Sequence, residues 1–190
     1  MSKPLPVGFY NRPTLQVARD LIGARLVRVR GGLRMEGLIT ETVAYIGEAD
    51  QACHAKAGRT PRTALMYGRP GRAYVYFTYG MHWLLNAVTG PVGHPAAVLI
   101  RAIQPLSGIE AMAARRRGRG FDGPAKLTEA LEINGDDYGA DLTKTASGLW
   151  IERGIPIPPG GVRKGPRVGI QRVPEPWRSK PWRFIARTPF

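Results

Sequence analysis

The sequence predicts an α+β fold in which residues 1–190 form one compact domain, with flanking helices around a curved, mostly antiparallel sheet. Three observations favour this class. Short runs of alternating or apolar residues, typical of strands, outnumber the helical patterns. Turns rich in glycine and proline separate these runs, and the chain has 24 Gly and 17 Pro. No internal repeat or linker divides the chain, and its length suits a single sizeable core.

The N-terminal segment predicts a short helix after an irregular start. Residues 1–13 are proline-rich and are expected to form an extended arm. Pro13 suits the first turn of a helix that runs to about Ile22, with apolar residues on one face and Gly23 as the stop signal.

Two strands and a long connection are expected next. Residues 24–30 and 33–45 have the pattern of strands joined by a Gly-Gly turn, and Gly37 marks a break or bulge in the second strand. Residues 46–71 are polar, basic and rich in Gly and Pro. Because a connection of this length is uncommon inside a compact domain and is often functional, this loop is a candidate part of a site.

The segment 74–86 predicts a β-hairpin with an unusual tip. Its first half alternates as a strand does, Gly80 interrupts it, and a second apolar run ends at Asn86, so the chain is expected to turn near Tyr79. A purely structural turn favours small polar residues, whereas this one carries a large aromatic residue. In a basic protein, such a tip is typical of a wedge inserted between DNA base pairs. The alternative is a core hairpin whose tyrosines simply pack.

An arginine interrupts the next apolar strand, residues 96–103. Because an unpaired buried charge is costly, Arg101 is expected to have a partner, and the alternative is an edge arginine that points into water. Ser107 and Glu110 have the spacing of a capping box, which predicts a helix to about Arg117. The basic run that ends this helix suits either the negative helix C-terminus or a DNA phosphate.

The C-terminal third predicts one helix and three short strands. Pro124 suits the first turn of a helix that ends at about Leu131, and the free N–H groups there, beside Lys126, would suit a phosphate. A proline-rich loop follows later in this segment. The strands are expected at residues 149–152, 167–170 and 183–186.

Charge is the most informative feature of the composition. The chain has 28 Lys+Arg against 14 Asp+Glu, a net charge of +14 and a pI near 10.7, which favours nucleic acid as the partner. The sequence predicts no membrane span and no signal peptide. The single cysteine, Cys53, fits a reducing compartment, so we expect a location in the cytoplasm and nucleoid, or in the nucleus of a eukaryote. One cysteine and three scattered histidines fit no zinc site.

Several motifs together resemble the alkyladenine DNA glycosylases, also called 3-methyladenine or N-methylpurine DNA glycosylases. The motifs occur in order and cover nearly the whole chain, which makes the match more specific than any one of them. They are ITETVAYIG (39–47), His54, TPR (60–62), the hairpin 74–86, LIRA (99–102), GPAKL (123–127) and RVGI (167–170).

The resemblance implies an enzyme that binds damaged double-stranded DNA from the minor groove and flips a modified purine out of the stack. It would then hydrolyse the N-glycosidic bond of an alkylated or deaminated purine of the 3-methyladenine, 7-methylguanine or hypoxanthine type. The family works without a lysine nucleophile, so the enzyme would be monofunctional. No metal or other cofactor is implied, and we expect a monomer.

The resemblance also assigns roles to residues. Tyr79, with Met81 beside it, would intercalate into the space that the flipped base leaves. Arg101 would position the catalytic water and the backbone of the lesion. The base pocket would consist of Tyr45, His54, Tyr76 and Asn86, and the phosphate contacts of Arg59, Arg62 and Lys126.

One position departs from the family pattern. The family motif is Glu-Thr-Glu-Ala-Tyr, in which the second glutamate is the general base that activates water, and Val43 stands at that place. Valine cannot accept a proton, and the loss of a positioned general base typically costs about 10²–10⁴ in rate. Three explanations remain open: a glycosylase altered at this position, a substitute acid (Glu41, Glu48 or Asp50), or a protein that binds damaged bases without cutting them. A basic RNA-binding module is a further alternative.

Overall fold

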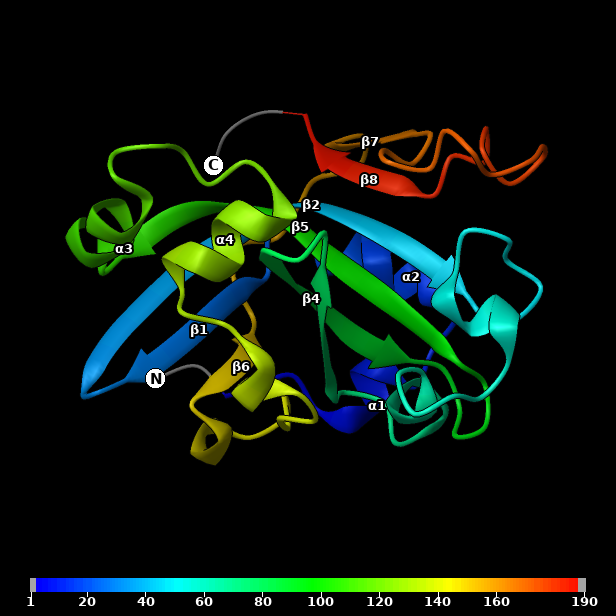
Figure 1. Cartoon of the computed structure of the whole chain (residues 1–190). Helices are drawn as coiled ribbons and strands as arrows, with labels where there is room; N and C mark the ends of the chain where they lie inside the picture. Colours follow the sequence, from blue (N-terminus) through cyan, green and yellow to red (C-terminus); the bar gives the residue numbers. More distant parts are fainter. Residues whose placement is uncertain (1–2, 188–190) are drawn as a thin grey trace.

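An antiparallel sheet of eight strands organises the computed structural model, which describes residues 3–187. Six strands lie in the order β3-β4-β5-β2-β1-β6, while β8 pairs with both β2 and β7. The strong curl of this sheet is visible in Figure 1. The predicted α+β class with a curved antiparallel sheet is therefore confirmed. The strands are β1 (Arg25–Arg30), β2 (Leu33–Ile46), β3 (Ala73–Thr78), β4 (His82–Thr89), β5 (Ala96–Ser107), β6 (Leu149–Glu152), β7 (Val162–Gly165) and β8 (Arg183–Ala186).

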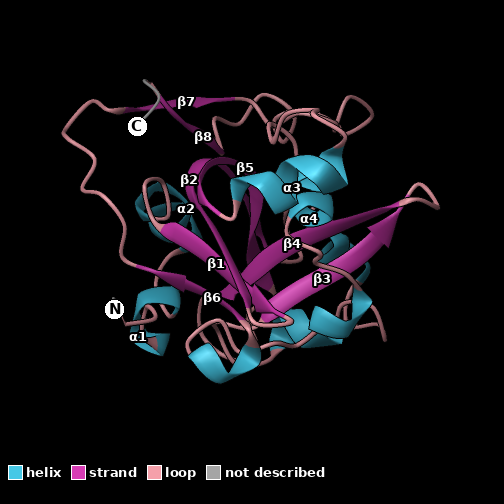
Figure 2. Cartoon of the chain, turned by 90° about the vertical axis from the view of Figure 1, so that its left-hand side faces the viewer, coloured by secondary structure: helices cyan, strands magenta, loops and turns pink. Residues whose placement is uncertain are grey.

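Short helices flank the sheet (Figures 1 and 2). Helix α2 packs against β2 and β5, and α4 packs against β4, β5 and α3. Pro124 occupies the first turn of α4, as the sequence predicts. The α-helices are α1 (Val7–Tyr10), α2 (Thr14–Asp20), α3 (Ile109–Arg116) and α4 (Pro124–Ala130), and the 3-10 helices are η1 (His54–Ala57), η2 (Ala64–Tyr67), η3 (Gly135–Asp137) and η4 (Thr145–Ser147).

The two faces of the sheet carry different clusters, because successive side chains of a strand point to opposite sides. On one face Ala44 pairs with Val98, and both belong to the main core beneath the helices. On the other face Tyr45 pairs with Ala97, and both belong to a second, smaller cluster. Helices η1 and η2, within the long loop 46–71, supply the buried cover of this second cluster. The loop that sequence analysis marked as a candidate therefore closes one face of the sheet.

Two expectations near helix starts are wrong. Within the expected arm 1–13, of which residues 1–2 lie outside the described part, Val7–Tyr10 form the helical turn α1 because Tyr10 is anchored in the core. Ser107 is the last residue of β5 and caps nothing, so the predicted capping box is absent. The N-cap of α3 is Gly108, with φ of 67°, where a Cβ would lie 2.8 Å from the Arg34 carbonyl oxygen.

The predicted strand over residues 167–170 is also wrong. This segment has no strand hydrogen bonds, Gly169 has φ of 82°, and Arg167 turns inward into a buried ion pair. The partner of β8 is instead Val162–Gly165, a polar stretch with no alternating apolar pattern to reveal it.

The predicted bulge at Gly37 is confirmed. The register between β2 and β5 shifts between Glu36 and Gly37. A Cβ on Gly37 would lie 2.9 Å from the carbonyl oxygen of Gln104, so this crossing of the strands requires glycine.

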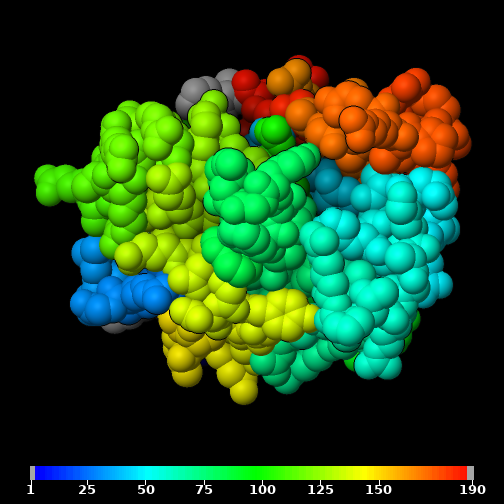
Figure 3. Space-filling view, in the orientation of Figure 1, coloured from blue at the N-terminus to red at the C-terminus, as the bar shows by residue number. Residues whose placement is uncertain are grey.

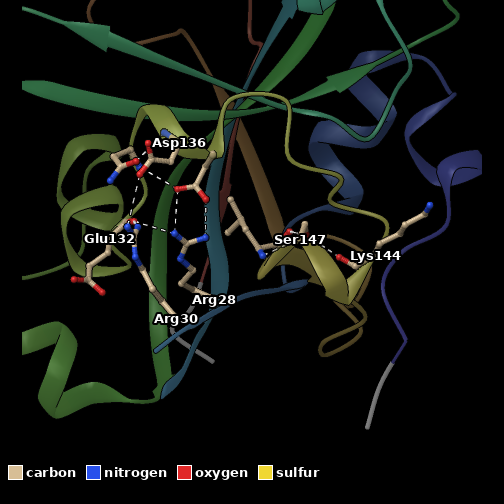
Figure 4. A network of polar contacts seen from close by, with 9 residues as sticks. Arg28, Arg30, Glu132, Asp136, Lys144 and Ser147 are labelled. Atoms are coloured by element: carbon tan, nitrogen blue, oxygen red, sulfur yellow. Dashed lines mark hydrogen bonds and ion pairs between the residues drawn. The ribbon is translucent and has the colours of Figure 1, made fainter. Parts of the chain in front are cut away.

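A buried arginine fastens η3 to the sheet (Figure 4). Arg28 on β1 donates to both carboxylate oxygens of Asp137, at 2.6 and 3.2 Å, and to the carbonyl oxygen of Glu132. Neighbouring Arg30 donates to the same carbonyl. The connection after α4 is therefore tied to the strands rather than free to move.

Candidate active site

A small cavity opens beside the second cluster. Figure 3 shows its setting, with the hairpin at the front, the loop 46–71 in cyan beside it and the C-terminal segment in orange above. The cavity brings together the four residues expected to form the base pocket. Its lining is Tyr45, Ala52, Cys53, His54, Met66, Tyr74, Tyr76, Asn86 and Ala97.

Strand geometry explains how two of the tyrosines and the asparagine meet. Tyr74 and Tyr76 are two residues apart on β3, so their side chains share one face of the sheet. Asn86 on β4 is the cross-strand partner of Tyr74 and donates from Nδ2 to the Tyr74 carbonyl oxygen at 3.0 Å. This bond fixes the amide of a nearly fully buried side chain at the cavity wall.

The loop side of the cavity is formed by His54, the first residue of η1. Its Nδ1 lies 3.0 Å from the Tyr74 hydroxyl, and its ring meets that of Tyr76 edge-on at 4.6 Å. Burial, followed by the nearby Arg62 guanidinium, lowers the pKa of His54 to about 4. Burial raises the pKa of Tyr45 to about 12. At neutral pH these side chains are therefore uncharged, and none of the nine described lining residues carries a carboxylate.

The hairpin of β3 and β4 extends beyond the rest of the sheet, at the right-hand side of Figure 2. Tyr74, Tyr76 and Asn86 at its base line the cavity. Three large apolar side chains are exposed on it: Phe77, Tyr79 at 83% and Met81 at 68%. Tyr79 has φ of 51°, a left-handed conformation that costs a non-glycine residue about 1–3 kcal/mol. A strained and exposed aromatic side chain gains little from packing within the hairpin itself.

Val43 lies in a row of residues that crosses four strands. Leu99 on β5 is the register partner of both Asn86 and Val43, and Val43 is in turn the partner of Arg183 on β8. All four side chains of this row therefore project from the face that carries the cavity. Val43 is 1% exposed and is not itself part of the cavity lining.

The carboxylate nearest along this strand, Glu41, is held by two arginines. Arg101 Nη1 donates to both of its oxygens, at 2.9 and 3.1 Å, and Arg183 Nε donates to Oε1. The expectation that Arg101 has a partner is confirmed. Because both oxygens of Glu41 already accept hydrogen bonds from cations, this group is poorly placed to accept a proton from water.

The two loop acids also have other partners. Asp50 is buried and forms an ion pair with Arg167 at 2.6 Å. Glu48 accepts a hydrogen bond from the Tyr67 hydroxyl at 2.6 Å. Neither carboxylate lines the cavity, so the structure brings none of the three suggested acids to it.

The three residues expected to contact DNA phosphates lie in different parts of the structure. Arg62 sits at the cavity, with its guanidinium 5.0 Å above the Tyr76 ring, and Arg59 lies over Tyr67 on the same loop. Lys126 lies on α4, outside the cavity lining, and pairs with Asp122 at 2.8 Å.

Sequence reasoning missed several residues that the structure adds to the site. Tyr74 lines the cavity, and the alternation that placed it on the same face as Tyr76 was a sufficient signal. Arg183 and the pair of Asp50 with Arg167 had no such signal, because their partners lie 142 and 117 residues away in the sequence.

Within residues 3–187, no group of three or more His, Cys, Asp or Glu side chains is arranged to hold a metal ion. None of the helices in this range is long and apolar enough to cross a membrane.

Comparisons with known proteins show the family of this chain. The family model described as Methylpurine-DNA glycosylase (MPG) matches residues 8–189. A relative from Myxococcus xanthus is 44% identical over 96% of this chain and 90% of its own length. Relatives from Anaeromyxobacter dehalogenans and Methanocella arvoryzae are each 47% identical, over 96% and 95% of this chain and 83% and 90% of theirs. All three carry the provisional name 3-methyladenine DNA glycosylase. Because the family model and these relatives match nearly the full length, the chain belongs to the methylpurine-DNA glycosylase family.

Proposed function

We propose that this protein flips N-alkylated purines out of double-stranded DNA and releases the cationic ones, such as 3-methyladenine and 7-methylguanine, by hydrolysis. The observation that carries this proposal is the uncharged aromatic cavity beside an exposed aromatic hairpin tip. Tyr79 supplies the wedge, and the cavity receives the base that leaves the stack. The net charge of +14 supplies the attraction to DNA phosphates.

The charge of the damaged purine determines how fast this chain can release it without a general base at position 43. A cationic purine departs as a neutral molecule when the N-glycosidic bond breaks and its electron pair passes to the base. Water adds to the sugar carbon and gives its proton to solvent, without a positioned general base to speed this step. A neutral purine such as hypoxanthine needs a proton as well, and His54 stays neutral at physiological pH.

The nine residues that line the cavity carry no charge at neutral pH, and their aromatic faces suit any flat purine. The guanidinium groups of Arg62 and Arg167 already lie over two of these rings, 5.0 Å from the Tyr76 centroid and 5.2 Å from the Tyr45 centroid. The preference for a cationic lesion therefore rests on its quality as a leaving group. The chemistry also requires no Schiff base, since Lys126 lies outside the cavity lining.

A second candidate function is the recognition of damaged bases without cleavage. Val43, together with the carboxylate of Glu41 that Arg101 and Arg183 bind, favours it. In that function the wedge and cavity act as above, and the bound lesion remains attached to its sugar.

Base release and binding, measured together, separate these functions. One duplex carries a single 7-methylguanine, a second carries hypoxanthine, and a third is undamaged. Free 7-methylguanine above the spontaneous rate, detected by mass spectrometry, supports the glycosylase. Preferential binding of the 7-methylguanine duplex without release, even with protein in excess, supports the second candidate. Equal affinity for all three duplexes contradicts both.

A further inference from the structure

A buried ion pair lies directly behind the cavity wall. The side chains of Arg167 and Asp50 are both fully buried, and their atoms meet at 2.6 Å and 2.8 Å. The guanidinium also donates to the carbonyl oxygens of Ala44, at 3.1 Å, and Trp177, at 3.0 Å. One side chain therefore joins strand β2, the loop 46–71 and the C-terminal segment.

The same guanidinium lies between two aromatic rings. Its central carbon is 5.2 Å from the ring centroid of Tyr45 and 4.9 Å from that of Trp182. Tyr45 is a cavity residue, whereas Trp182 belongs to the segment before β8. The flat cation thus lies over both rings, and its contact with Tyr45 favours that ring remaining in place.

Asp50 acts on the other half of the wall. Its carboxylate accepts hydrogen bonds from the backbone N–H groups of Ile46, at 3.1 Å, and Ala52, at 3.0 Å. The chain continues directly from Ala52 into Cys53 and His54, which line the cavity. The carboxylate therefore sets the path by which the loop brings His54 to Tyr74.

Stability alone does not explain such a pair. Desolvating two charges costs several kcal/mol per ion, and apolar residues of similar volume often stabilise a protein equally well. The contacts of this pair instead converge on one structure, the wall formed by Tyr45 and His54. Side chains that bind a ligand need support of this kind to hold them within a fraction of an ångström.

We propose that Arg167 and Asp50 are positioning residues that hold Tyr45 and His54 in the geometry that accepts a flipped purine. This proposal rests on the proposed function and specifies which buried groups set lesion discrimination. Its measure is the ratio of affinities for a 7-methylguanine duplex and for an undamaged duplex of the same sequence. A group that only stabilises the fold does not change this ratio in folded protein.

Two variants and two matched controls test it by fluorescence anisotropy with labelled duplexes, below the melting temperature of each protein. Asp50→Asn is compared with Glu152→Gln, because Glu152 is also buried and bound by arginines, but on β6 at the opposite edge of the sheet. Arg167→Lys is compared with Arg28→Lys, whose buried guanidinium also binds an aspartate (Figure 4). Both members of each comparison change the charge equally.

The expected result is a fall in the affinity ratio of about 5- to 100-fold for Asp50→Asn and Arg167→Lys, the equivalent of one lost base stack. The affinity for undamaged DNA should remain that of the parent protein. If Asp50→Asn does not fold, Arg167→Lys decides, because lysine keeps the charge beside Asp50 and loses the flat contacts with Tyr45 and Trp182 and the forked hydrogen bonds of the guanidinium. The control Arg28→Lys loses a comparable set of forked hydrogen bonds, but away from the cavity. Affinity ratios that stay at the parent value, or fall equally in the controls, overturn the positioning role. A parent protein without lesion preference contradicts the proposed function instead.

Discussion

Restoring a carboxylate at the general-base position is the most direct test of the chemistry. In the variant Val43→Glu, the new side chain would project from the face that carries the cavity, with Arg183 as its register partner. Arg101 is also near, because it binds the same Glu41 carboxylate as Arg183. Two arginines and one glutamate now give this cluster a charge of +1, and a second glutamate brings it to zero. The buried carboxylate would therefore have cationic neighbours rather than an apolar surrounding.

The magnitude follows from the value of a positioned base. We expect base release to rise by about 10²–10⁴, which corresponds to about 3–5 kcal/mol of activation free energy. The gain should be larger for hypoxanthine than for 7-methylguanine, because the cationic base leaves readily without help. Affinity for the lesion duplex should change little, because Val43 is not part of the cavity lining.

Single-turnover kinetics with protein in excess measure this prediction, since product release then does not limit the rate. Val43→Gln is the control, because glutamine has nearly the shape of glutamate and accepts no proton. Equal gains in Val43→Gln and Val43→Glu would show that side-chain volume, rather than basicity, was responsible. Equal proportional gains on both lesions would refute the argument from leaving-group charge.

Three further predictions concern recognition and stability. Tyr79→Ala should weaken binding of a lesion duplex by about 1–3 kcal/mol, because a stacking contact is lost, and should leave the melting temperature unchanged. Val92→Ala, at another exposed apolar side chain, is the control. Unchanged affinity of Tyr79→Ala would contradict the wedge role. Lesion affinity should stay level from pH 8 to about 5.5 and fall toward pH 4, because protonated His54 would repel a cationic base; a transition centred near pH 6.5 would contradict this. The same lowered pKa means that acidification from about pH 6.5 to 4 favours the unfolded state, which binds the proton first. Glu41→Gln should lower the free energy of unfolding in urea by about 1–3 kcal/mol, because it leaves Arg101 and Arg183 without their shared carboxylate; no change would show that water satisfies both arginines.

Much of the architecture was present in local sequence patterns. Alternation predicts most of the strands, and the same period of two places Tyr74 and Tyr76 on one face. Gly37 predicted the bulge, because a glycine inside a strand pattern has no side chain to pack and often marks a bulge. The hairpin tip was equally visible, since Tyr79 stands where a small polar residue is usual.

The expectations that failed were also local, and tertiary contacts overrode them. Ser107 has the spacing of a cap, but pairing with β2 extends β5 through it. The apolar run after Arg167 has a strand-like composition, but the buried pair of Arg167 with Asp50 determines its path. Local helix or strand propensity predicts poorly where a buried ion pair or a neighbouring strand determines the backbone conformation.

By itself, the sequence determined the elements, the faces of the strands, the basic charge and the unusual valine at position 43. Only the tertiary structure decided which groups surround that valine. Strand register placed Arg183 beside Val43, and the fold turned Arg167 into the space behind Tyr45. A repeating pattern along one strand carries no information about its partner across the sheet, and the residues that complete this site come from chain segments more than a hundred positions apart.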